Sequence, residues 1–395
     1  MTETTTAETI VTAYETAAYV IKSEEFGATD APHDGLPFVA GSVLHMNGTE
    51  HRSRRRVEAP LFGKNAVLHY ENDVLIAATH RQIQRQHPKS IRGESSANLV
   101  EVARRIMLEV AAALIGLDET DDDERLSLLE ECMYPLTEAV ELKWTERDPR
   151  EVVREGLAAK DVFAREFVDP ASARRLALEP QQRPLDLIAL LLSTEDFADD
   201  PDLPCREAIV FLAGSTLTTS TAIVATVLEL ERWFEKYPED RRLAADDTFL
   251  LAATNETLRL QPTAPYLPKQ ALTDIVLPDG RAVAKGHTVL IDRAAIHRDT
   301  TVFGEDADVF NPRRETPSRI APYGLAFGGG RHQCIGKPLV SDVRPGGDGE
   351  PRRAIPVIIA ALYEHGLRLD PTRTSARAAS AQHRFASLPV LFTAP

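Results

Sequence analysis

A cysteine with basic neighbours is the residue whose chemistry is most specific in this chain. Cys334 lies within residues 325–340, which read LAFGGGRHQCIGKPLV. Arg331 and His332 bring positive charge and hydrogen-bond donors close to its thiol, which favours the thiolate. A thiolate serves as a nucleophile or as a ligand of a soft cation. No second cysteine or histidine follows at zinc-site spacing, so Cys334 is a candidate axial ligand of a heme iron.

The glycines around Cys334 indicate close approach of the backbone to a large, flat group. Gly328, Gly330 and Gly336 have no Cβ atom, so the chain there can adopt positive φ angles or pass close to a ligand. A phosphate-binding loop with an incidental cysteine is the alternative, but the motif GxxxxGK[ST] is absent. The pattern therefore favours a heme-thiolate loop.

Composition and charge narrow the class of protein. The 395 residues include 45 Lys and Arg and 60 Asp and Glu, a net charge of −15. A chain this acidic is a poor general binder of nucleic acid. Its apolar stretches are shorter than the ~20 residues that span a bilayer, and its first residues do not read as a signal peptide. Three cysteines far apart in sequence suit a reducing compartment. We expect a cytoplasmic protein that binds neither nucleic acid nor membrane.

Hydrophobic periodicity predicts a mainly α fold with a small β portion. Helices are expected over residues 12–22, 97–115, 126–139, 149–168, 184–192, 203–237 and 246–260. The longest, 203–237, is apolar enough for its middle to be buried on most sides. After Pro262, short β-like runs appear, including ALTDIVL, HTVLID and RFASLPVLF. Because strands from distant parts of the chain must pair, we expect one domain over residues 1–395.

The cysteine loop resembles that of a known family. Residues 327–336, FGGGRHQCIG, match the pattern F-G-x-G-x-[HR]-x-C-x-G of the cytochrome P-450 monooxygenases at every defined position. The resemblance extends from about residue 13 to the end of the chain. It implies the cytochrome P-450 fold and heme b, with the Cys334 thiolate on the iron. It also implies that the loop residues at the heme are Phe327, Gly328, Gly330, His332 and Gly336.

Two further motifs resemble structural marks of the same family. Glu256 and Arg259 form an E-x-x-R pair, and residues at i and i+3 share a helix face. Residues 310–314, FNPRR, resemble F-x-P-x-R. The resemblance implies that Arg314 joins Glu256 and Arg259 in a buried network, where loss of one member would leave an unpaired charge.

A third motif resembles the family's binding site for the heme propionates. His51 and Arg55 match H-x-x-x-R, and residues four apart face one way on a helix. Arg can pair with a carboxylate through two hydrogen bonds. At the third propionate position the family usually has Arg, whereas this chain has Lys269, a point donor. The alternative is a basic helix that docks an acidic partner.

The oxygen-activating helix departs from the family pattern A-G-x-[DE]-T. After Ala213 and Gly214 the chain reads STLTTS, so Thr216 stands at the position of the acid and Leu217 at that of the alcohol. Thr218 is one residue further, about 100° round the helix. Either Thr216, Thr218, water or the substrate delivers protons, or these hydroxyls merely bond to helix carbonyls.

Two other departures concern the chain's start and its proximal face. The second helix of the family resembles a segment beginning near residue 13, so the N-terminal elements are expected to be shortened. Residues 341–353, SDVRPGGDGEPRR, are expected to interrupt the helix after Cys334, because Pro and Gly forbid a regular helix.

The resemblance implies a monooxygenase that inserts one oxygen atom of O2 into a small organic substrate. A ferredoxin-type protein would supply electrons, and a natural-product intermediate is the substrate expected by fold-level analogy. Two alternatives stay open. One is a heme-thiolate enzyme that uses peroxide or performs coupling or rearrangement, because the acid–alcohol pair is missing. The other is a non-catalytic heme-binding recruitment protein.

Overall fold

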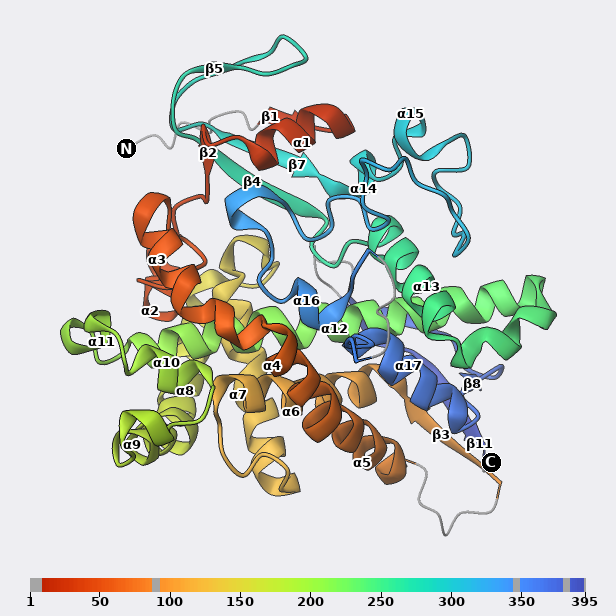
Figure 1. Cartoon of the computed structure of the whole chain (residues 1–395), viewed down its shortest axis with the longest axis horizontal. Helices are drawn as coiled ribbons and strands as arrows, with labels where there is room; N and C mark the ends of the chain where they lie inside the picture. Colours follow the sequence, from red (N-terminus) through yellow and green to blue (C-terminus); the bar gives the residue numbers. More distant parts are fainter. Residues whose placement is uncertain (1–8, 87–92, 344–348, 379–383, 394–395) are drawn as a thin grey trace.

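A helical body carries small β sheets at two separate places, at the top and at the lower right of Figure 1. The computed structural model describes residues 9–86, 93–343, 349–378 and 384–393. The principal helices of the first half are α1 Tyr14–Lys22, α2 Leu36–Val39, α3 Gly48–Glu58, α4 Lys64–His69, α5 Ile76–Gln86, α6 Leu99–Ile115, α7 Asp123–Val140, α8 Pro149–Phe163 and α9 Asp169–Leu176. Those of the second half are α10 Leu187–Leu191, α11 Glu195–Asp199, α12 Leu203–Lys236, α13 Asp247–Leu260, α14 Arg293–Ile296, α15 Thr300–Phe303, α16 Lys337–Val340 and α17 Ala354–Glu364.

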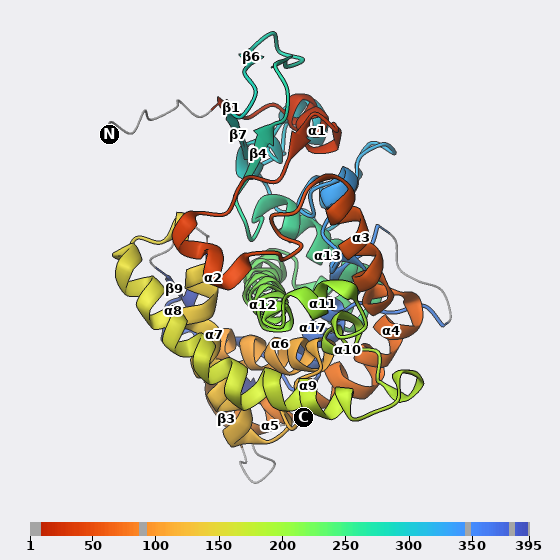
Figure 2. The same ribbon diagram turned by 90° about the vertical axis from the view of Figure 1, so that its left-hand side faces the viewer.

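Helix α12 forms the axis of the helical body. Figure 2 shows it nearly end-on, with α6, α7, α8 and α10 around it. Its residues are mostly buried, and it packs along α6 and α7. It is long and apolar enough to cross a membrane, but 72% of its most apolar window is buried by the rest of the fold. The apolar composition of α12 therefore reflects a central core helix.

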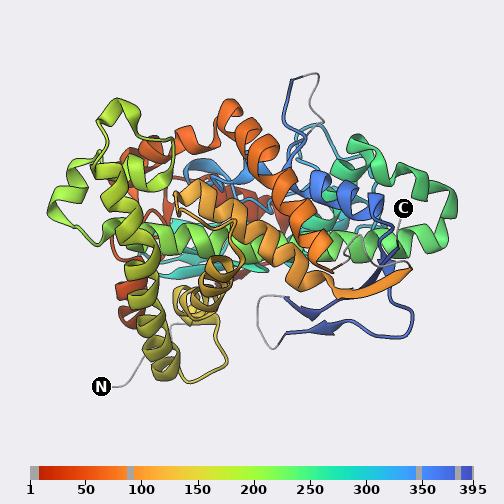
Figure 3. The same ribbon diagram turned by 90° about the horizontal axis from the view of Figure 1, so that it is seen from below.

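Four small sheets join distant parts of the chain. The first has the order β1-β7-β4-β2, in which β1 (Thr9–Val11) runs parallel to β7 (Thr288–Asp292). On its other edge, β4 (Tyr266–Ala271) pairs with β7 and with β2 (Phe26–Gly27). In the second sheet, β11 (Pro389–Thr393) lies between β3 (Glu94–Asn98) and β8 (Arg368–Leu369), and Figure 3 shows this pairing of early and late strands. The two remaining sheets pair β5 (Ile275–Val276) with β6 (Ala282–Val283) and β9 (Ala376–Arg377) with β10 (Phe385–Ser387).

The predicted helices lie close to observed ones, but the β-like run ALTDIVL holds only the last residue of β4 and the two-residue strand β5. The helix expected over 149–168 passes into a π-helical turn, Ala164–Val168, and then into α9. The expected interruption after Cys334 is present: α16 ends at Val340 and α17 begins at Ala354, although residues 344–348 lie outside the described structure. At its far end, the Glu71 carboxylate accepts the backbone N–H groups of Arg352 and Arg353. The interrupting segment is therefore tied to the π-helical turn Tyr70–Leu75.

Candidate functional site

The Cys334 loop is a tight turn held by its own backbone. The N–H of Cys334 donates to the carbonyl of Phe327 at 2.9 Å. Gly328 and Gly330 have φ angles of 66° and 60°, which explains why glycine stands at both positions. A Cβ atom at Gly330 would also lie 3.1 Å from the carbonyl oxygen of Ile21 at the end of α1. Glycine thus lets the loop turn and pack against the first helix.

The Cys334 thiol lies deep in the protein among amide donors and cations. Burial raises the pKa of its thiol, whereas the backbone N–H groups of Gly336 and Lys337 and the charges of Arg55 and Arg293 act in the opposite direction. Yet the residue is exposed. The loop therefore leaves part of Cys334 uncovered while its thiol is surrounded by the protein. Amide donors and two cations are what a bound thiolate needs.

One face of α12 borders open space on the same side of the molecule. Gly214 is exposed in the middle of this buried helix, and a Cβ atom placed there would meet nothing within 4 Å. One turn before it, Phe211 contacts Phe62, with ring centroids 6.2 Å apart. Phe62 also lies 3.8 Å from the position of a Cβ at Gly336. Phe62 therefore links the cysteine loop to this face of α12.

The structure separates the two threonines that the sequence offered for proton delivery. Thr218 is partly exposed and donates its hydroxyl hydrogen bond to the carbonyl of Gly214, so it shares the open face. Thr216 is fully buried, and its hydroxyl has no hydrogen-bond partner among the residues that the structure describes. Ala213 is buried as well. Of the predicted oxygen-site residues, Gly214 and Thr218 border the open space, while Thr216 points into protein.

Two histidines and an arginine come together beside the cysteine loop. His51 of α3 stacks on His332, with ring centroids 4.1 Å apart and planes at 27°. Arg55, one turn after His51, donates to the carbonyl of Gln333 at 2.7 Å. Burial and neighbouring cations lower the pKa of His51 to about 4 and that of His332 to about 3. Both imidazoles are therefore neutral at pH 7, because burial and the surrounding positive charge disfavour protonation of the rings.

Two further cations complete this group, and sequence reasoning found only one of them. Lys269 of β4 is 4% exposed, and burial followed by the charge of Arg293 lowers its pKa to about 8. Arg293 follows β7, the strand that pairs with β4. Its Nη1 donates to the carbonyl of Ala264, but its Nε is buried without a partner. The one available signal was an arginine directly after a buried strand. We call His51, Arg55, Lys269, Arg293 and His332 the basic cluster.

The basic cluster fits two carboxylates that the protein does not supply. No hydrogen bond or ion pair to a carboxylate is present for Lys269, Arg293, His51 or His332 among the described residues. Buried cations normally have counterions. Heme b carries two propionates and needs one axial thiolate, which Cys334 can provide. The donor set and the open space beside Gly214 therefore fit this cofactor.

The predicted Glu256 network lies behind the cysteine loop and is fully paired. The Glu256 carboxylate accepts Nε and Nη2 of Arg259 at 2.8 and 2.7 Å and Nε of Arg314 at 3.0 Å. Arg259, which is completely buried, also donates to the carbonyls of His297 and Ala307. His297 in turn accepts the N–H of Leu325 at 2.8 Å, at the start of the cysteine loop. This network is structural and positions the loop.

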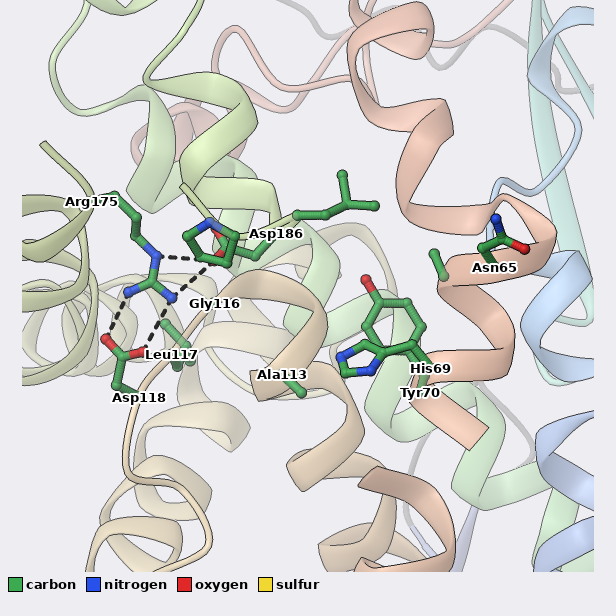
Figure 4. Close-up of a pocket in the computed structure, with 12 residues that line it drawn as sticks. Asn65, His69, Tyr70, Ala113, Gly116, Leu117, Asp118, Arg175 and Asp186 are labelled. Atoms are coloured by element: carbon green, nitrogen blue, oxygen red, sulfur yellow. Dashed lines mark hydrogen bonds and ion pairs between the residues drawn. The ribbon is translucent and has the colours of Figure 1, made fainter. Parts of the chain in front are cut away.

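Two surface pockets lie apart from this site. One, of about 510 Å³, lies between α4 and the end of α6, and Figure 4 shows Arg175 at its edge. Both Asp118 and Asp186 pair with Arg175, so its charge is already neutralised. The other, of about 800 Å³, lies near the end of α13 beside Gln261. None of the predicted site residues lines either pocket.

Comparison with known proteins identifies relatives of the whole fold. The model of the cytochrome P-450 family matches residues 244–340. Bifunctional cytochrome P-450/NADPH–P-450 reductase 2 of Bacillus subtilis is 32% identical over 190 residues, which are 43% of this chain and 18% of that relative. Cytochrome P-450-SU2 of Streptomyces griseolus is 27% identical over 84% of this chain and 76% of its own length. The structure of P-450BioI, solved with an acyl carrier protein ligated to hexadec-9Z-enoic acid, superposes with a TM-score of 0.77. That alignment covers 97% of this chain and 92% of the other, at 22% identity.

Proposed function

We propose that this chain, which belongs to the cytochrome P-450 family, inserts one oxygen atom of O2 into a small organic substrate with electrons from a ferredoxin-type donor. Proteins of this family are oxidoreductases that bind heme b. The observation that carries the proposal is the position of Cys334: Arg55 and Arg293 of the basic cluster act on its thiol, and its loop contacts the Gly214 side of α12 through Phe62.

The residues of the chain divide the work of holding the cofactor. Cys334 would be the axial ligand, and its thiolate would be stabilised by the N–H groups of Gly336 and Lys337. The basic cluster would hold the two propionates, with Arg55 and Arg293 as the permanent cations. When bound, heme supplies the activation of dioxygen and the oxidation of the substrate, favoured by the thiolate. The protein's task is to orient the substrate, exclude water and deliver protons.

The Gly214 face of α12 is where dioxygen and substrate would meet the protein. Gly214 leaves room because it has no side chain. Thr218 places a hydroxyl on the same face, bonded to the Gly214 carbonyl. We assign Thr218, and not Thr216, as the hydroxyl that orders water at this face, since the Thr216 side chain is enclosed by protein. Leu217 precedes it in the chain, so no carboxylate stands directly beside Thr218.

The substrate class follows by analogy. P-450BioI binds an acyl carrier protein ligated to a fatty acid, and relatives of this chain occur in Streptomyces. A natural-product intermediate, free or tethered to a carrier, is therefore the substrate we would test first. We expect the enzyme to act in the cytoplasm. A peroxide-driven or non-hydroxylating oxidation is the second candidate, favoured by the missing carboxylate beside Thr218.

An optical titration of the purified protein tests the proposal. We expect a low-spin ferric heme with thiolate ligation that shifts to high spin when a substrate displaces water. Ferredoxin with its reductase, and then hydrogen peroxide, would be offered to the protein with the compound that shifts it. Oxygen incorporation from labelled O2 supports the monooxygenase; turnover with peroxide alone supports the second candidate. A protein without heme would contradict both.

A further inference from the structure

A second group of unpartnered polar atoms lies between α3 and α12. Glu58, the last residue of α3, is fully buried, and within the described part of the chain neither oxygen of its carboxyl group faces a hydrogen-bond donor. The Nε of Arg54 and the hydroxyl of Ser42 are also buried without partners. Buried polar groups are almost always hydrogen-bonded, so an unsatisfied carboxyl group requires a physical explanation.

The explanation is a proton shared with a second acid. The carboxyl group of Glu207 on α12 lies within hydrogen-bond reach of Glu58. Glu207 accepts Nη1 of Arg54 at 2.9 Å and the N–H of Val43 at 3.1 Å, so it is the ionised member. Burial, followed by the charge of Glu207, raises the pKa of Glu58 to about 9. Glu58 therefore keeps its proton at neutral pH and donates it to Glu207.

The pair has a charged connection to the surface. Arg54 bonds Glu207 with one amino group and Asp196 of α11 with the other, at 2.8 Å. The Asp196 side chain is 63% exposed. Arg55 is the other charged residue that acts on Glu58. Arg54 thus anchors the buried acid pair to a surface carboxylate, and its guanidinium, which stays protonated, holds Glu207 ionised.

Glu207 of the acid pair lies on the same side of α12 as Gly214 and Thr218, although it is fully buried. Glu207, Phe211, Gly214 and Thr218 recur at intervals of four, three and four residues, which places them on one side of the helix. Seven residues from Glu207 to Gly214 correspond to about 10 Å along the axis. This is the side that borders the cysteine loop through Phe62. The carboxylate missing next to Thr218 is therefore replaced, about three turns earlier on α12, by a pair that holds a proton.

We infer that Glu58 and Glu207 form the proton source for dioxygen reduction at the Gly214 face of α12. The inference rests on the proposed function, whose reaction RH + O2 + 2e⁻ + 2H⁺ → ROH + H2O consumes two protons, the electrons coming from the ferredoxin-type donor. The O–H bond of Glu58 breaks, its proton passes through Glu207 and water to the dioxygen being reduced, and Glu58 regains a proton from solvent water, while the Arg54 guanidinium stays protonated throughout. A second such cycle supplies the second proton.

The variant Glu58→Gln tests this role because it keeps the shape and one donor of the protonated acid but has no transferable proton. The heme-loaded protein, reduced by a surrogate ferredoxin and its reductase, would be assayed for the share of consumed O2 released as hydrogen peroxide. We expect that share to rise, with the proton-dependent step slowed by about tenfold or more. Glu231→Gln is the matched control, a buried carboxylate on α12 that pairs with Arg241.

The pH profile and infrared spectrum separate proton supply from a merely structural clamp. In the wild-type protein, the peroxide share should rise as pH increases through the pKa of Glu58, and Glu58→Gln should show no such change. The infrared band of a protonated carboxylic acid should persist at pH 8 and vanish in Glu58→Gln. An unchanged peroxide share in Glu58→Gln, or no such band in the wild type, would overturn the inference while leaving the proposed function intact. A wild-type protein with heme that consumes no O2 would overturn both.

Discussion

Two buried charged groups flank the cysteine loop, and they differ in whether the protein completes them. In the Glu256 network, every cation has an acceptor: Arg259 has four and Arg314 reaches both Glu256 and Asp306. In the basic cluster, Lys269 and Arg293 repel one another, and Arg293 has an unpartnered Nε. A network that satisfies itself stabilises the fold, whereas a cluster that lacks its counter-charges is built for something it binds.

The largest effect is expected when the thiol of Cys334 is replaced, because the heme proposed to bind beside the basic cluster would lose its thiolate ligand. Cys334→Ser should abolish the thiolate signature of the heme spectrum and all O2-dependent oxidation, because a hydroxyl does not supply the thiolate's electron density. Absorption spectroscopy of the reduced, carbon monoxide-bound protein measures it. Cys205→Ala, which changes a cysteine in the core, serves as the control. A thiolate signature that persisted in Cys334→Ser would remove Cys334 from the site.

Breaking the complete network should cost the most stability. Glu256→Gln leaves the guanidinium of fully buried Arg259 without its carboxylate. We expect the free energy of unfolding to fall by about 3–5 kcal/mol, measured by denaturation of matched preparations. The exposed pair of Arg147 and Glu155 provides the control, and Glu155→Gln should change the same quantity by less than about 1 kcal/mol. Equal effects of the two variants would mean that burial does not distinguish them.

In heme-free protein, removing a charge from the basic cluster should raise the free energy of unfolding, the opposite of the effect expected for the Glu256 network. Lys269→Met removes a buried cation without a partner, so heme-free protein should gain stability while heme affinity falls by about tenfold or more. Because the folded protein holds the pKa of Lys269 at about 8, below its usual 10.5, stability in heme-free wild type should be lost as pH falls from 10.5 towards 8. Thermal unfolding against pH and heme transfer to an acceptor globin measure the two effects. Loss of both stability and heme would contradict the comparison.

The stacked histidines make the same cluster sensitive to acid. Their folded pKa values, about 4 for His51 and about 3 for His332, lie below the usual 6.5. The unfolded chain therefore binds more protons below pH 6.5, and heme-free protein should lose stability as pH falls from there towards 3. His332→Gln should lessen this loss. The midpoint of thermal unfolding would be measured for wild type and His332→Gln between pH 4 and 7. If the midpoint changed equally with pH in both proteins, the stacked histidines would not be the acid-sensitive element.

The same comparison of partnered and unpartnered groups applies to two threonines of α12, Thr218 and Thr216. Their alanine variants should have the smallest effects. Thr218→Ala removes the hydroxyl at the open face and should lower the yield of product per electron a few-fold. Thr216→Ala removes a buried hydroxyl that has no partner, so it should leave that yield unchanged. Product and NADH consumption would be measured together. The reverse ranking would move the oxygen site to the other side of the helix.

Motifs with fixed spacing could be interpreted from the sequence because local geometry sets them. The cysteine loop, the Glu256–Arg259 pair and the His51–Arg55 pair each lie within one turn or loop, and the structure places them in one region. The sequence motifs did not identify Arg293, because its proximity to Lys269 is created by the pairing of β4 with β7. Sequence reasoning also missed Glu58 and Glu207, because they are 149 residues apart and come together only where α3 packs near α12.

The sequence by itself indicated a resemblance to the cytochrome P-450 family, a mainly helical fold and Cys334 as the predicted heme ligand, because periodicity and a ten-residue motif are local properties of the chain. Only the tertiary structure decided which buried charges are complete. It paired Glu256, left Lys269 and Arg293 without carboxylates, and brought Glu58 against Glu207. Whether a charge is satisfied depends on neighbours from distant segments, so it is settled only when the chain has folded.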